Sequence, residues 1–392
     1  MTYQVLARKY RPQVFADLVG QEALVKTLTN AINNNRIHHA YLFTGIRGVG
    51  KTTTARIIAK GLNCEQGFTT NPCGQCGSCT SITKGNHPDV FEFDAASNRG
   101  IDDAKELLSG IAYEPISARK KIYIVDEVHM MTKEAFNSLL KTLEEPPADV
   151  VFIFATTEVN KVPATILSRC QKFVLRSLSA DELCLHLKNI CQKEGVQIED
   201  SALHLIAGKA DGSVRDSLSI LDQVIISAHE FAESSTIIDL AFVAKIINVV
   251  DAEDVTELLN LIVNNNPANA LAKLDTMLGA GFLEEDLING LLSLINDLLK
   301  IKVKAIDLSL CRASAIELAK SLSVPIILRL WQAALKALAE LYTPGSNRAK
   351  IEVLIIKMCY GASLPSPAEV VAKIKDGGLT SIIDAFDAKI VD

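Results

Sequence analysis

Short apolar runs alternate with helical patterns over the first half of the chain. Apolar runs of this length are typical of buried strands. They cover residues 40–44, 89–93, 121–125, 150–156 and 171–175. The helical stretches between them predict βαβ units, and therefore an α/β fold around a five-stranded parallel sheet. Ligands of such sheets bind at the carboxyl ends of the strands.

The pattern changes past the fifth predicted strand, where strand-like runs end. Residues 181–228 have the pattern of a small helical bundle, with a turn at Gly212 and Ser213. Helical patterns begin again near Asp239 and continue to about Gly361, and several have apolar stripes broad enough for a core and a partner. We therefore expect an α/β domain at 1–178, a small helical domain at 179–240, a larger helical domain at 241–363 and a linker or tail at 364–392.

Composition excludes several classes of protein. The 392 residues are too many for one ordinary core, and 48% of them are hydrophobic, which excludes disorder over most of the chain. No apolar run reaches the roughly 18 residues of a membrane span, and the N-terminus lacks a signal pattern, so we expect a soluble cytoplasmic protein. The net charge is −6, yet residues 1–60 hold nine Lys or Arg against two acidic residues. This basic end suits a phosphate-bearing partner, and any contact with DNA should be local.

Residues 45–52 match the phosphate-binding pattern G-x-x-x-x-G-K-[ST] at every fixed position. They lie between an apolar strand and a helical segment, which disfavours the alternative of a chance glycine-rich turn. Backbone N–H groups of such a loop wrap phosphates, Lys51 would reach the β- and γ-phosphates, and the Thr52 hydroxyl would bind Mg²⁺. The predicted nucleotide contacts in this loop are Gly45, Ile46, Arg47, Gly48, Val49, Gly50, Lys51 and Thr52.

Another predicted strand, 121–125, ends in the neighbouring carboxylates Asp126 and Glu127. In P-loop NTPases an acid at such a strand end helps to hold Mg²⁺, and a neighbouring Glu can orient the attacking water. We assign Asp126 to Mg²⁺ and Glu127 to the general base. The pair alone could merely end a strand, but the complete phosphate loop favours the functional interpretation.

Four cysteines lie close together in the sequence: Cys64, Cys73, Cys76 and Cys79. Two overlapping C-x-x-C spacings, with glycines between them, suit tetrahedral Zn²⁺ coordination by four sulfurs. A redox disulfide would use two cysteines and leave two idle. Four thiolates leave no open position for water, so we predict a structural zinc rather than a catalytic one. The remaining cysteines are expected to be buried or inert: Cys170, Cys184, Cys191, Cys311 and Cys359.

Further motifs occur in a characteristic order along residues 3–216. They are the phosphate loop, the cysteine insert and residues 6–12, 15–21, 94–97, 126–129, 155–157, 168–170 and 212–216. With them the chain resembles the bacterial DNA polymerase III gamma/tau family, which are clamp-loader AAA+ ATPases. The later helices are similar to that family's oligomerisation collar. The cysteine insert together with Ser168-Arg169-Cys170 is the most specific part of the resemblance.

The resemblance implies an AAA+ fold with a zinc insert at 64–79, a helical lid and an all-α collar, and it implies ATP, Mg²⁺ and Zn²⁺ as cofactors. Thr157 looks like the sensor of the γ-phosphate, and Arg215 like the lid sensor that contacts nucleotide. Arg169 looks like the arginine finger that reaches a neighbouring subunit's ATP. A guanidinium there would neutralise charge that spreads during phosphoryl transfer. Arg11 and Val19 belong to a basic segment similar to the one that closes over adenine.

The function implied by the resemblance is that of an ATP-driven motor, which loads the β sliding clamp onto primed DNA during chromosomal replication. The implied partners are other clamp-loader subunits (delta, delta-prime and further gamma/tau copies) through the collar, the β clamp, and primer–template DNA through sequence-independent phosphate contacts at 97–100. No membrane partner is implied. The resemblance includes none of the helicase- or polymerase-binding domains of the family's longer form. Nor does the chain show the metal-binding carboxylates of a polymerase site.

Two other interpretations stay open at this point. A helicase-type AAA+ ring, such as a branch-migration motor, would lack the zinc insert. A non-catalytic stator resembling the delta-prime subunit would share the zinc module and the Ser-Arg-Cys motif, but its phosphate loop would be degraded. The intact loop at 45–52 and the four cysteines favour the motor subunit.

Overall fold

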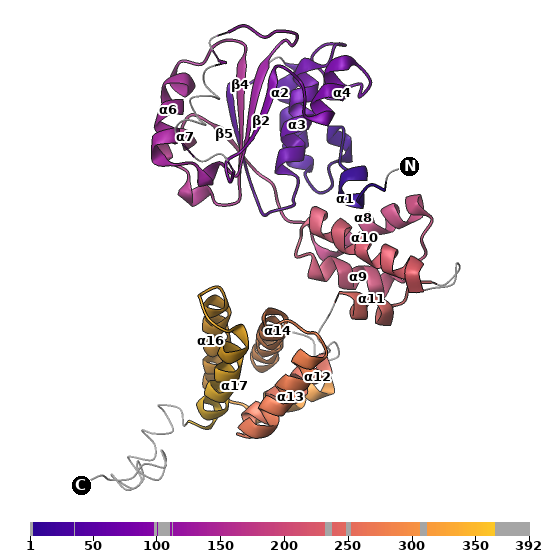
Figure 1. The fold of residues 1–392 in the computed structure, drawn as a ribbon, viewed down its shortest axis with the longest axis vertical. Helices are drawn as coiled ribbons and strands as arrows, with labels where there is room; N and C mark the ends of the chain where they lie inside the picture. Colours follow the sequence, from indigo (N-terminus) through magenta and orange to yellow (C-terminus); the bar gives the residue numbers. More distant parts are fainter. Residues whose placement is uncertain are drawn as a thin grey trace, which may run out of the picture. The chain divides into compact units, whose positions relative to one another are not determined.

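The computed structural model describes residues 3–34, 36–97, 100, 110–111, 113–231, 237–247, 252–305 and 312–364. The chain divides into two compact units, Met1–Ile247 and Asn248–Asp392 (Figure 1). Each unit has a hydrophobic core of its own. No single helix in the described ranges is long and apolar enough to cross a membrane; one pair, Ala313–Ser321 and Val324–Leu341, passes that test only together and is bent by 110°.

The first unit contains the predicted parallel sheet. Its strands are β1 (Ala40–Thr44), β2 (Val90–Asp94), β3 (Lys121–Asp126), β4 (Val150–Thr156) and β5 (Gln171–Val174). Their order is β2-β3-β4-β1-β5, and every neighbouring pair is parallel. The five strands confirm the strands predicted from the hydrophobic pattern, to within about a residue at each end. Because β4 lies between β1 and β3, residues that follow β4 stand between the phosphate loop and the two carboxylates.

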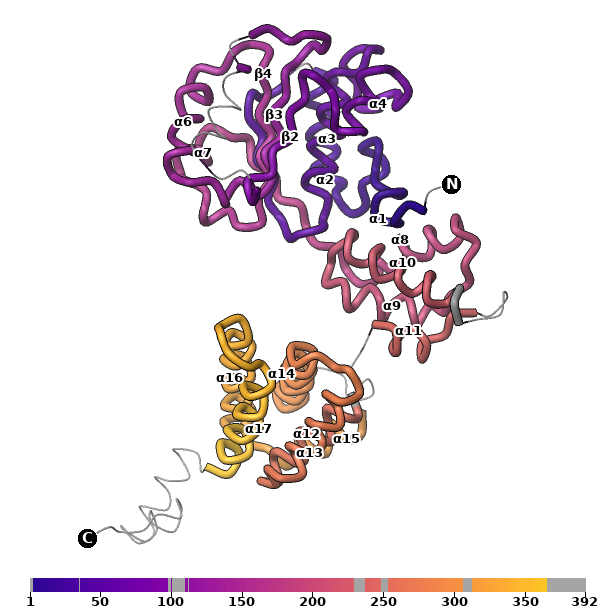
Figure 2. The backbone as a smooth tube through the Cα atoms, in the orientation of Figure 1, coloured from indigo at the N-terminus to yellow at the C-terminus, as the bar shows by residue number. Residues whose placement is uncertain are grey.

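Helices cover both faces of the sheet (Figure 2). The described helical elements of residues 3–178 are α1 (Leu6–Lys9), η1 (Phe15–Asp17), α2 (Glu22–Asn33), α3 (Lys51–Asn63), α4 (Gly77–Lys84), η2 (Val128–Met130), α6 (Lys133–Glu144), η3 (Val159–Lys161) and α7 (Ala164–Leu167). Alternate strand residues enter different cores, as the period of a strand requires. Phe43 packs with the α2 and α3 side, whereas Leu42 packs with α6 and α7.

Four helices complete the first unit: α8 (Ala180–Glu194), α9 (Asp200–Lys209), α10 (Val214–Phe231) and α11 (Leu240–Ile246). A capping box starts α8, because Ser179 accepts from the Glu182 N–H while Glu182 accepts from the Ser179 N–H. The sequence placed the domain boundary after residue 240. The structure places the break between units after α11, because Val243 is buried in the core that α8, α9 and α10 share.

The second unit is entirely helical where it is described. Its helices are α12 (Ala252–Val263), α13 (Pro267–Gly279), α14 (Glu284–Lys302), α15 (Ala313–Ser321), α16 (Val324–Leu341) and α17 (Asn347–Ser363). Apolar residues of all six helices form its core. The expected linker or tail at 364–392 lies outside the described residues apart from Leu364.

Candidate functional site

The loop between β1 and α3 has the backbone that a phosphate-binding turn requires. Gly45 and Gly48 adopt φ angles of 151° and 78°, in the range that favours glycine. Side chains would also collide there: a Cβ on Gly45 would lie 2.5 Å from the Leu175 backbone oxygen, and one on Gly48 would lie 2.0 Å from Ser213 Oγ. The chain then enters α3 at Lys51. The first N–H groups of a long helix therefore face the loop, an arrangement suited to an anion.

Lys51 is held inside this loop. Its Nζ donates to the backbone oxygens of Gly45 and Ile46, both at 2.9 Å, and the residue is only 5% exposed. Burial lowers the pKa of Lys51, while the charges of Glu127 and Asp126 act in the opposite direction. The ammonium group thus lies where the loop curves and within electrostatic reach of both carboxylates.

Thr52 and Asp126 come from different elements and meet directly. Thr52 Oγ1 at the start of α3 donates to Asp126 Oδ2 at the end of β3, with a separation of 2.5 Å. The other carboxylate oxygen of Asp126 accepts from the Glu127 N–H at 2.9 Å. A hydroxyl and a carboxylate oxygen beside a phosphate site are the ligands that Mg²⁺ prefers. The donor set therefore fits the predicted magnesium ion.

Glu127 and Thr157 lie 30 residues apart in the sequence and are in contact in the fold. Glu127 Oε2 accepts from the Thr157 N–H at 3.2 Å and from Thr157 Oγ1 at 3.1 Å. Thr157 follows β4, the strand between β1 and β3. The sheet order thus brings the predicted base and the predicted sensor together beside the phosphate loop.

The start of α10 touches the phosphate loop. The Arg215 N–H donates to the backbone oxygen of Gly48 at 3.2 Å. Arg11 of the N-terminal segment lies close by: burial and the charges of Arg56, Arg215 and Arg8 lower its pKa, and only Glu92 opposes them. Such a concentration of guanidinium groups beside the loop favours a polyanionic ligand.

Val19 and its neighbours rest on the first core. Val19 is partly buried against that core. Gln21, two residues further on, is buried. Its side-chain amide donates to the backbone oxygen of Arg176, just past β5, and accepts from the Arg176 N–H. The segment predicted to close over adenine is therefore fixed near the carboxyl edge of the sheet, where β5 ends.

Arg169 lies near the amino ends of the strands, whereas the phosphate loop lies at their carboxyl ends. It precedes β5, whereas the loop follows the parallel strand β1. Within its own chain the guanidinium pairs with Glu144 and donates to the Thr165 backbone oxygen at 2.7 Å. The structure therefore does not bring Arg169 to the nucleotide site of the same chain.

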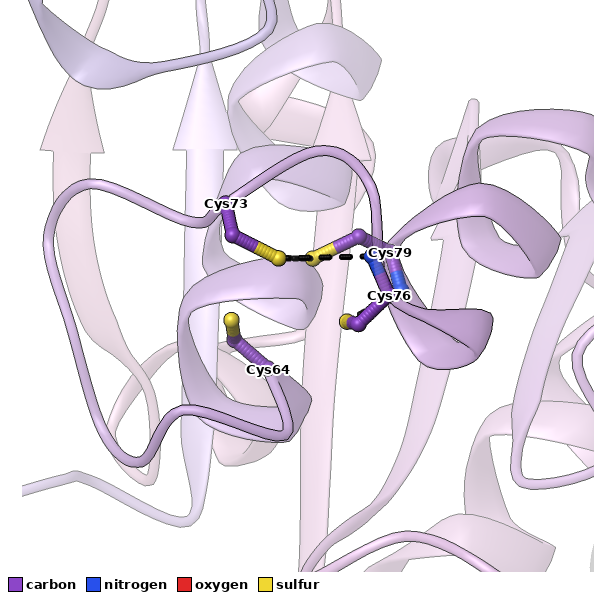
Figure 3. A group of neighbouring side chains, drawn as sticks. All are labelled: Cys64, Cys73, Cys76 and Cys79. Atoms are coloured by element: carbon purple, nitrogen blue, oxygen red, sulfur yellow. Dashed lines mark hydrogen bonds between the residues drawn. The ribbon is translucent and has the colours of Figure 1, made fainter.

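The four clustered cysteines converge between α3 and α4 (Figure 3). Their sulfurs all lie within 4.8 Å of one another, and Cys73 Sγ and Cys79 Sγ are 4.0 Å apart. Tetrahedral Zn–S bonds of about 2.3 Å place neighbouring sulfurs about 3.8 Å apart, whereas a disulfide needs about 2.05 Å. The Cys76 N–H donates to Cys73 Sγ at 3.4 Å, and the Cys79 N–H to Cys76 Sγ at 3.3 Å. Backbone N–H groups of Gln75 and Cys76 lower the pKa of Cys73 to about 6. The cluster fits the predicted zinc.

Most of the remaining cysteines are buried as expected. Cys184, Cys191 and Cys359 are buried in helices, and Cys170 is partly buried. Burial raises the pKa of Cys170 to about 12 and that of Cys191 to about 11, which disfavours the reactive thiolate. Cys311 lies outside the described residues, and so does Arg99, the basic residue of the expected DNA-facing segment at 97–100.

Sequence reasoning missed three groups around the site. Glu144 pairs with Arg169, and His129 lies beside Glu127. Lys60 is buried and donates from Nζ to the backbone oxygen of Gln13 at 2.8 Å, which ties the N-terminal segment to α3. All three contacts join different elements or depend on a turn's geometry, so spacing along the chain gave no signal for them.

Comparison with known proteins identifies the family. Three family models match successive parts of the chain: "DNA polymerase III, delta subunit" at 20–179, "DNA polymerase III clamp loader subunit, ATPase lid domain" at 182–230, and "DNA polymerase III subunits gamma and tau domain III" at 238–374. DNA polymerase III subunit tau of Bacillus subtilis is 36% identical over 385 residues, which are 96% of this chain and 67% of that protein. The chain belongs to the DNA polymerase III gamma/tau family.

Other family members are similar over shorter shares of their length. The tau subunit of Escherichia coli is 38% identical over 372 residues, 94% of this chain and 57% of that subunit. The tau/gamma subunit of Haemophilus influenzae is 53% identical over 225 residues, 57% of this chain and 33% of that protein. The chain thus spans little more than half the length of the Escherichia coli relative. Together with the parallel sheet and the helical lid, these findings confirm the AAA+ fold that the resemblance implied.

Two solved structures illustrate more distant likenesses. The Thermotoga maritima RuvB Holliday junction branch migration motor is 21% identical with a TM-score of 0.47, and the match covers 65% of this chain and 79% of that one. The Bacillus subtilis DNA clamp loader delta protein is 14% identical with a TM-score of 0.36, covering 86% of this chain and 99% of that one. At these scores the likenesses carry nothing about function.

Proposed function

We propose that this gamma/tau family member is the ATPase motor subunit of a DNA polymerase III clamp loader. It would use ATP binding and hydrolysis to load the β sliding clamp onto primed DNA during chromosomal replication. The observation that carries this proposal is the intact nucleotide site. Lys51 is enclosed by the loop, Thr52 meets Asp126, and Glu127 stands beside Thr157. The chain would act within the polymerase holoenzyme by hydrolysing ATP, without a polymerase site of its own.

Each residue of the site has a distinct task in this proposal. Loop N–H groups and Lys51 hold the β- and γ-phosphates, and Thr52 with Asp126 holds Mg²⁺, which neutralises phosphate charge when bound. Glu127 accepts a proton from the attacking water. Thr157, the neighbour of Glu127, senses the γ-phosphate. The contact between Thr157 and Glu127 supports these last two roles, because one ligand could then engage both side chains.

The lid and the N-terminal segment would enclose the rest of the nucleotide. Arg215 begins the helix that touches Gly48, so a guanidinium there can reach a phosphate held by the loop. Arg11 lies among the same positive charges, and Val19 belongs to the segment proposed to cover adenine. Closure of α8–α11 over ATP would then bury the reacting atoms away from water.

Arg169 would act on the ATP of a neighbouring subunit. Its position supports this role, because Arg169 lies at the amino ends of the strands whereas the phosphate loop of the same chain lies at their carboxyl ends. Assembly would use the second unit, where Leu328 and Leu335 of α16 and Tyr342, the residue that follows this helix, are exposed at a seven-residue spacing. The proposed partners are delta, delta-prime and further gamma/tau copies, with the β clamp and primer–template DNA as the substrates of the assembly.

The proposal is tested by reconstitution of the full chain with delta, delta-prime, β clamp and primed DNA. The expected result is ATP hydrolysis that clamp and primed DNA stimulate, and its absence when the motor carries Lys51→Ala. An assembly that forms completely but hydrolyses ATP no faster than the Lys51→Ala assembly would contradict the proposal.

A further inference from the structure

His129 occupies an enclosed position next to the predicted general base. It lies in η2, two residues past Glu127, and its side chain is 6% exposed. Nδ1 lies 3.0 Å from Thr156 Oγ1 and 3.4 Å from Glu127 Oε2, while Nε2 lies 3.4 Å from Glu158 Oε1. The ring therefore joins the end of β3 to the end of β4.

The backbone of Glu127 needs such support. Its φ is 46°, in the left-handed region that residues with side chains adopt at a free-energy cost. The Glu127 N–H donates to Asp126 Oδ1 at 2.9 Å, and its carbonyl accepts from the Met130 N–H at 2.9 Å. These bonds fix the backbone, but they leave the carboxylate to be held by its own contacts.

Two residues contact one oxygen of the carboxylate, Oε2. Thr157 donates to Oε2 through its N–H and its hydroxyl, and the His129 ring lies against the same oxygen. The anchor of the ring is itself rigid, because Thr156 is fully buried and its Oγ1 accepts from the Glu158 N–H at 3.0 Å. Both contacts to Oε2 thus connect the carboxylate to the end of β4, the strand beside the phosphate loop.

We propose that His129 is a positioning residue for the Glu127 carboxylate. It does not contact ATP; it fixes the base at the edge of the sheet that faces Lys51, so that the carboxylate is already oriented when water and the γ-phosphate arrive. Misplacement of a reacting group by about 1 Å can cost about 10²-fold in rate. The inference rests on the proposed ATPase function and adds a residue to its machinery.

Two substitutions distinguish a positioning role of the His129 imidazole from a role in which it only fills space. Leu has a similar volume but no polar atom, so His129→Leu removes the contacts to Thr156, Glu127 and Glu158 while it keeps the site filled. His129→Asn is smaller but returns a polar group near the place of Nδ1. His186 in α8 provides the matched control, because it is a largely enclosed histidine whose Nε2 has no hydrogen-bond partner in the structure.

The experiment uses the full chain in the reconstituted clamp loader, with ATP as the probe. It measures kcat and KM for hydrolysis stimulated by clamp and primed DNA, the ATP dissociation constant and the melting temperature. We expect His129→Leu to lower kcat by at least about tenfold with ATP affinity within about twofold of wild type. His129→Asn should recover most of that loss, and His186→Leu should leave kcat unchanged.

Two results would overturn the inference while the wild-type assembly stays active. One is an unchanged kcat in His129→Leu. The other is a joint fall of kcat, ATP affinity and melting temperature in His129→Leu that is also present in His129→Asn. That pattern would mean that the imidazole of His129 has only a structural role. A wild-type assembly without ATPase activity would instead remove the proposed function, and this inference with it.

Discussion

At the scale of single residues, the proposed roles assign binding and chemistry to different side chains. Lys51 projects into the loop and contacts its carbonyl oxygens, whereas Glu127 lies at the end of β3 and contacts Thr157 instead of the loop. In the proposed function, a substitution of Lys51 would therefore remove a phosphate contact, and a substitution of Glu127 would remove a proton acceptor.

Lys51→Ala and Glu127→Gln should have different effects. Loss of the ammonium removes charge-assisted hydrogen bonds worth about 1.5–3 kcal/mol each, so ATP affinity should fall at least about tenfold. Glu127→Gln should bind ATP nearly as well as wild type but hydrolyse it about 10²–10⁴-fold more slowly. Equilibrium ATP binding and single-turnover hydrolysis check both effects, and an equal loss of binding in the two variants would show that the roles are wrongly assigned.

The pairing of Arg169 with Glu144 is also a residue-scale feature. Both side chains are partly exposed, at 31% and 51%, and exposed ion pairs contribute only about 0–1 kcal/mol. The guanidinium can therefore exchange this carboxylate for a phosphate at little cost to the fold.

At the scale of elements, α3 connects the two predicted centres of the first unit. It begins at Lys51 in the phosphate loop and ends at Asn63, beside the first cysteine of the cluster. Its 13 residues span about 20 Å at 1.5 Å per residue. Damage at the metal end should therefore reach the nucleotide end only weakly.

Cys76→Ser should separate these two ends experimentally. Cys76 caps α4 and its sulfur is one of the four that converge, so its loss should reduce bound zinc below one equivalent and lower the melting temperature. ATP binding should persist. Metal analysis of freshly purified, reduced protein provides the measurement, with Cys191→Ser, a buried cysteine outside the cluster, as the control that keeps its zinc. Absence of zinc from the wild type would contradict the prediction.

The segment before β3 depends on one buried carboxylate. Asp89 accepts from the N–H groups of Ile116, Ser117 and Ala118 at 2.7, 2.7 and 2.8 Å. Burial alone would raise the pKa of Asp89, but these hydrogen bonds outweigh it and lower the pKa. Because the folded pKa lies below the unfolded one, the stabilisation is present above about pH 4 and is lost as the pH falls through the folded pKa.

Asp89→Asn should therefore lower the free energy of unfolding by about 1–3 kcal/mol at pH 7, because its amide group faces three donors. The difference from wild type should shrink in acid, where Asp89 itself becomes protonated. Denaturant unfolding over a pH series measures this, and Asp149→Asn, an exposed carboxylate, serves as the control. A difference that stays constant into acid would exclude the proposed role of the charge.

At the scale of the whole molecule, the predicted active site is incomplete in one chain. The phosphate loop lies at the carboxyl ends of the strands and Arg169 at their amino ends, so in the proposed function one subunit would present a nucleotide at one end and the arginine finger at the other. A ring of such subunits would complete each site with the next subunit's arginine.

Mixing two inactive variants tests this arrangement. Arg169→Ala should bind ATP normally as a monomer but lose about 10³–10⁵-fold in turnover once assembled, because a finger stabilises the transition state more than the ground state. Lys51→Ala lacks a working loop. Some mixed rings would place an intact Arg169 against an intact loop, so part of the ATPase activity should return. Fully assembled mixtures that stay inactive would indicate a role within one chain.

A large part of the fold and of the candidate site could be predicted from the spacing of residues along the chain. The five strands, the loop at 45–52 and the cysteine cluster were evident from the sequence, because each depends on residues that are close together in the chain and on backbone preferences that glycine or alternation imposes. The roles of Thr157, Arg169 and Arg215 came from family resemblance, since their positions show no chemistry without a fold around them.

Tertiary structure decided which of these groups meet. Thr52 reaches Asp126 across 74 residues because β4 separates β1 from β3 by one strand only. The same order places Thr157 against Glu127 and encloses His129 between two strand ends, while burial of Val243 assigns α11 to the first unit. Such contacts depend on long-range strand order and on shared burial, and neither is encoded in the spacing of residues along one element.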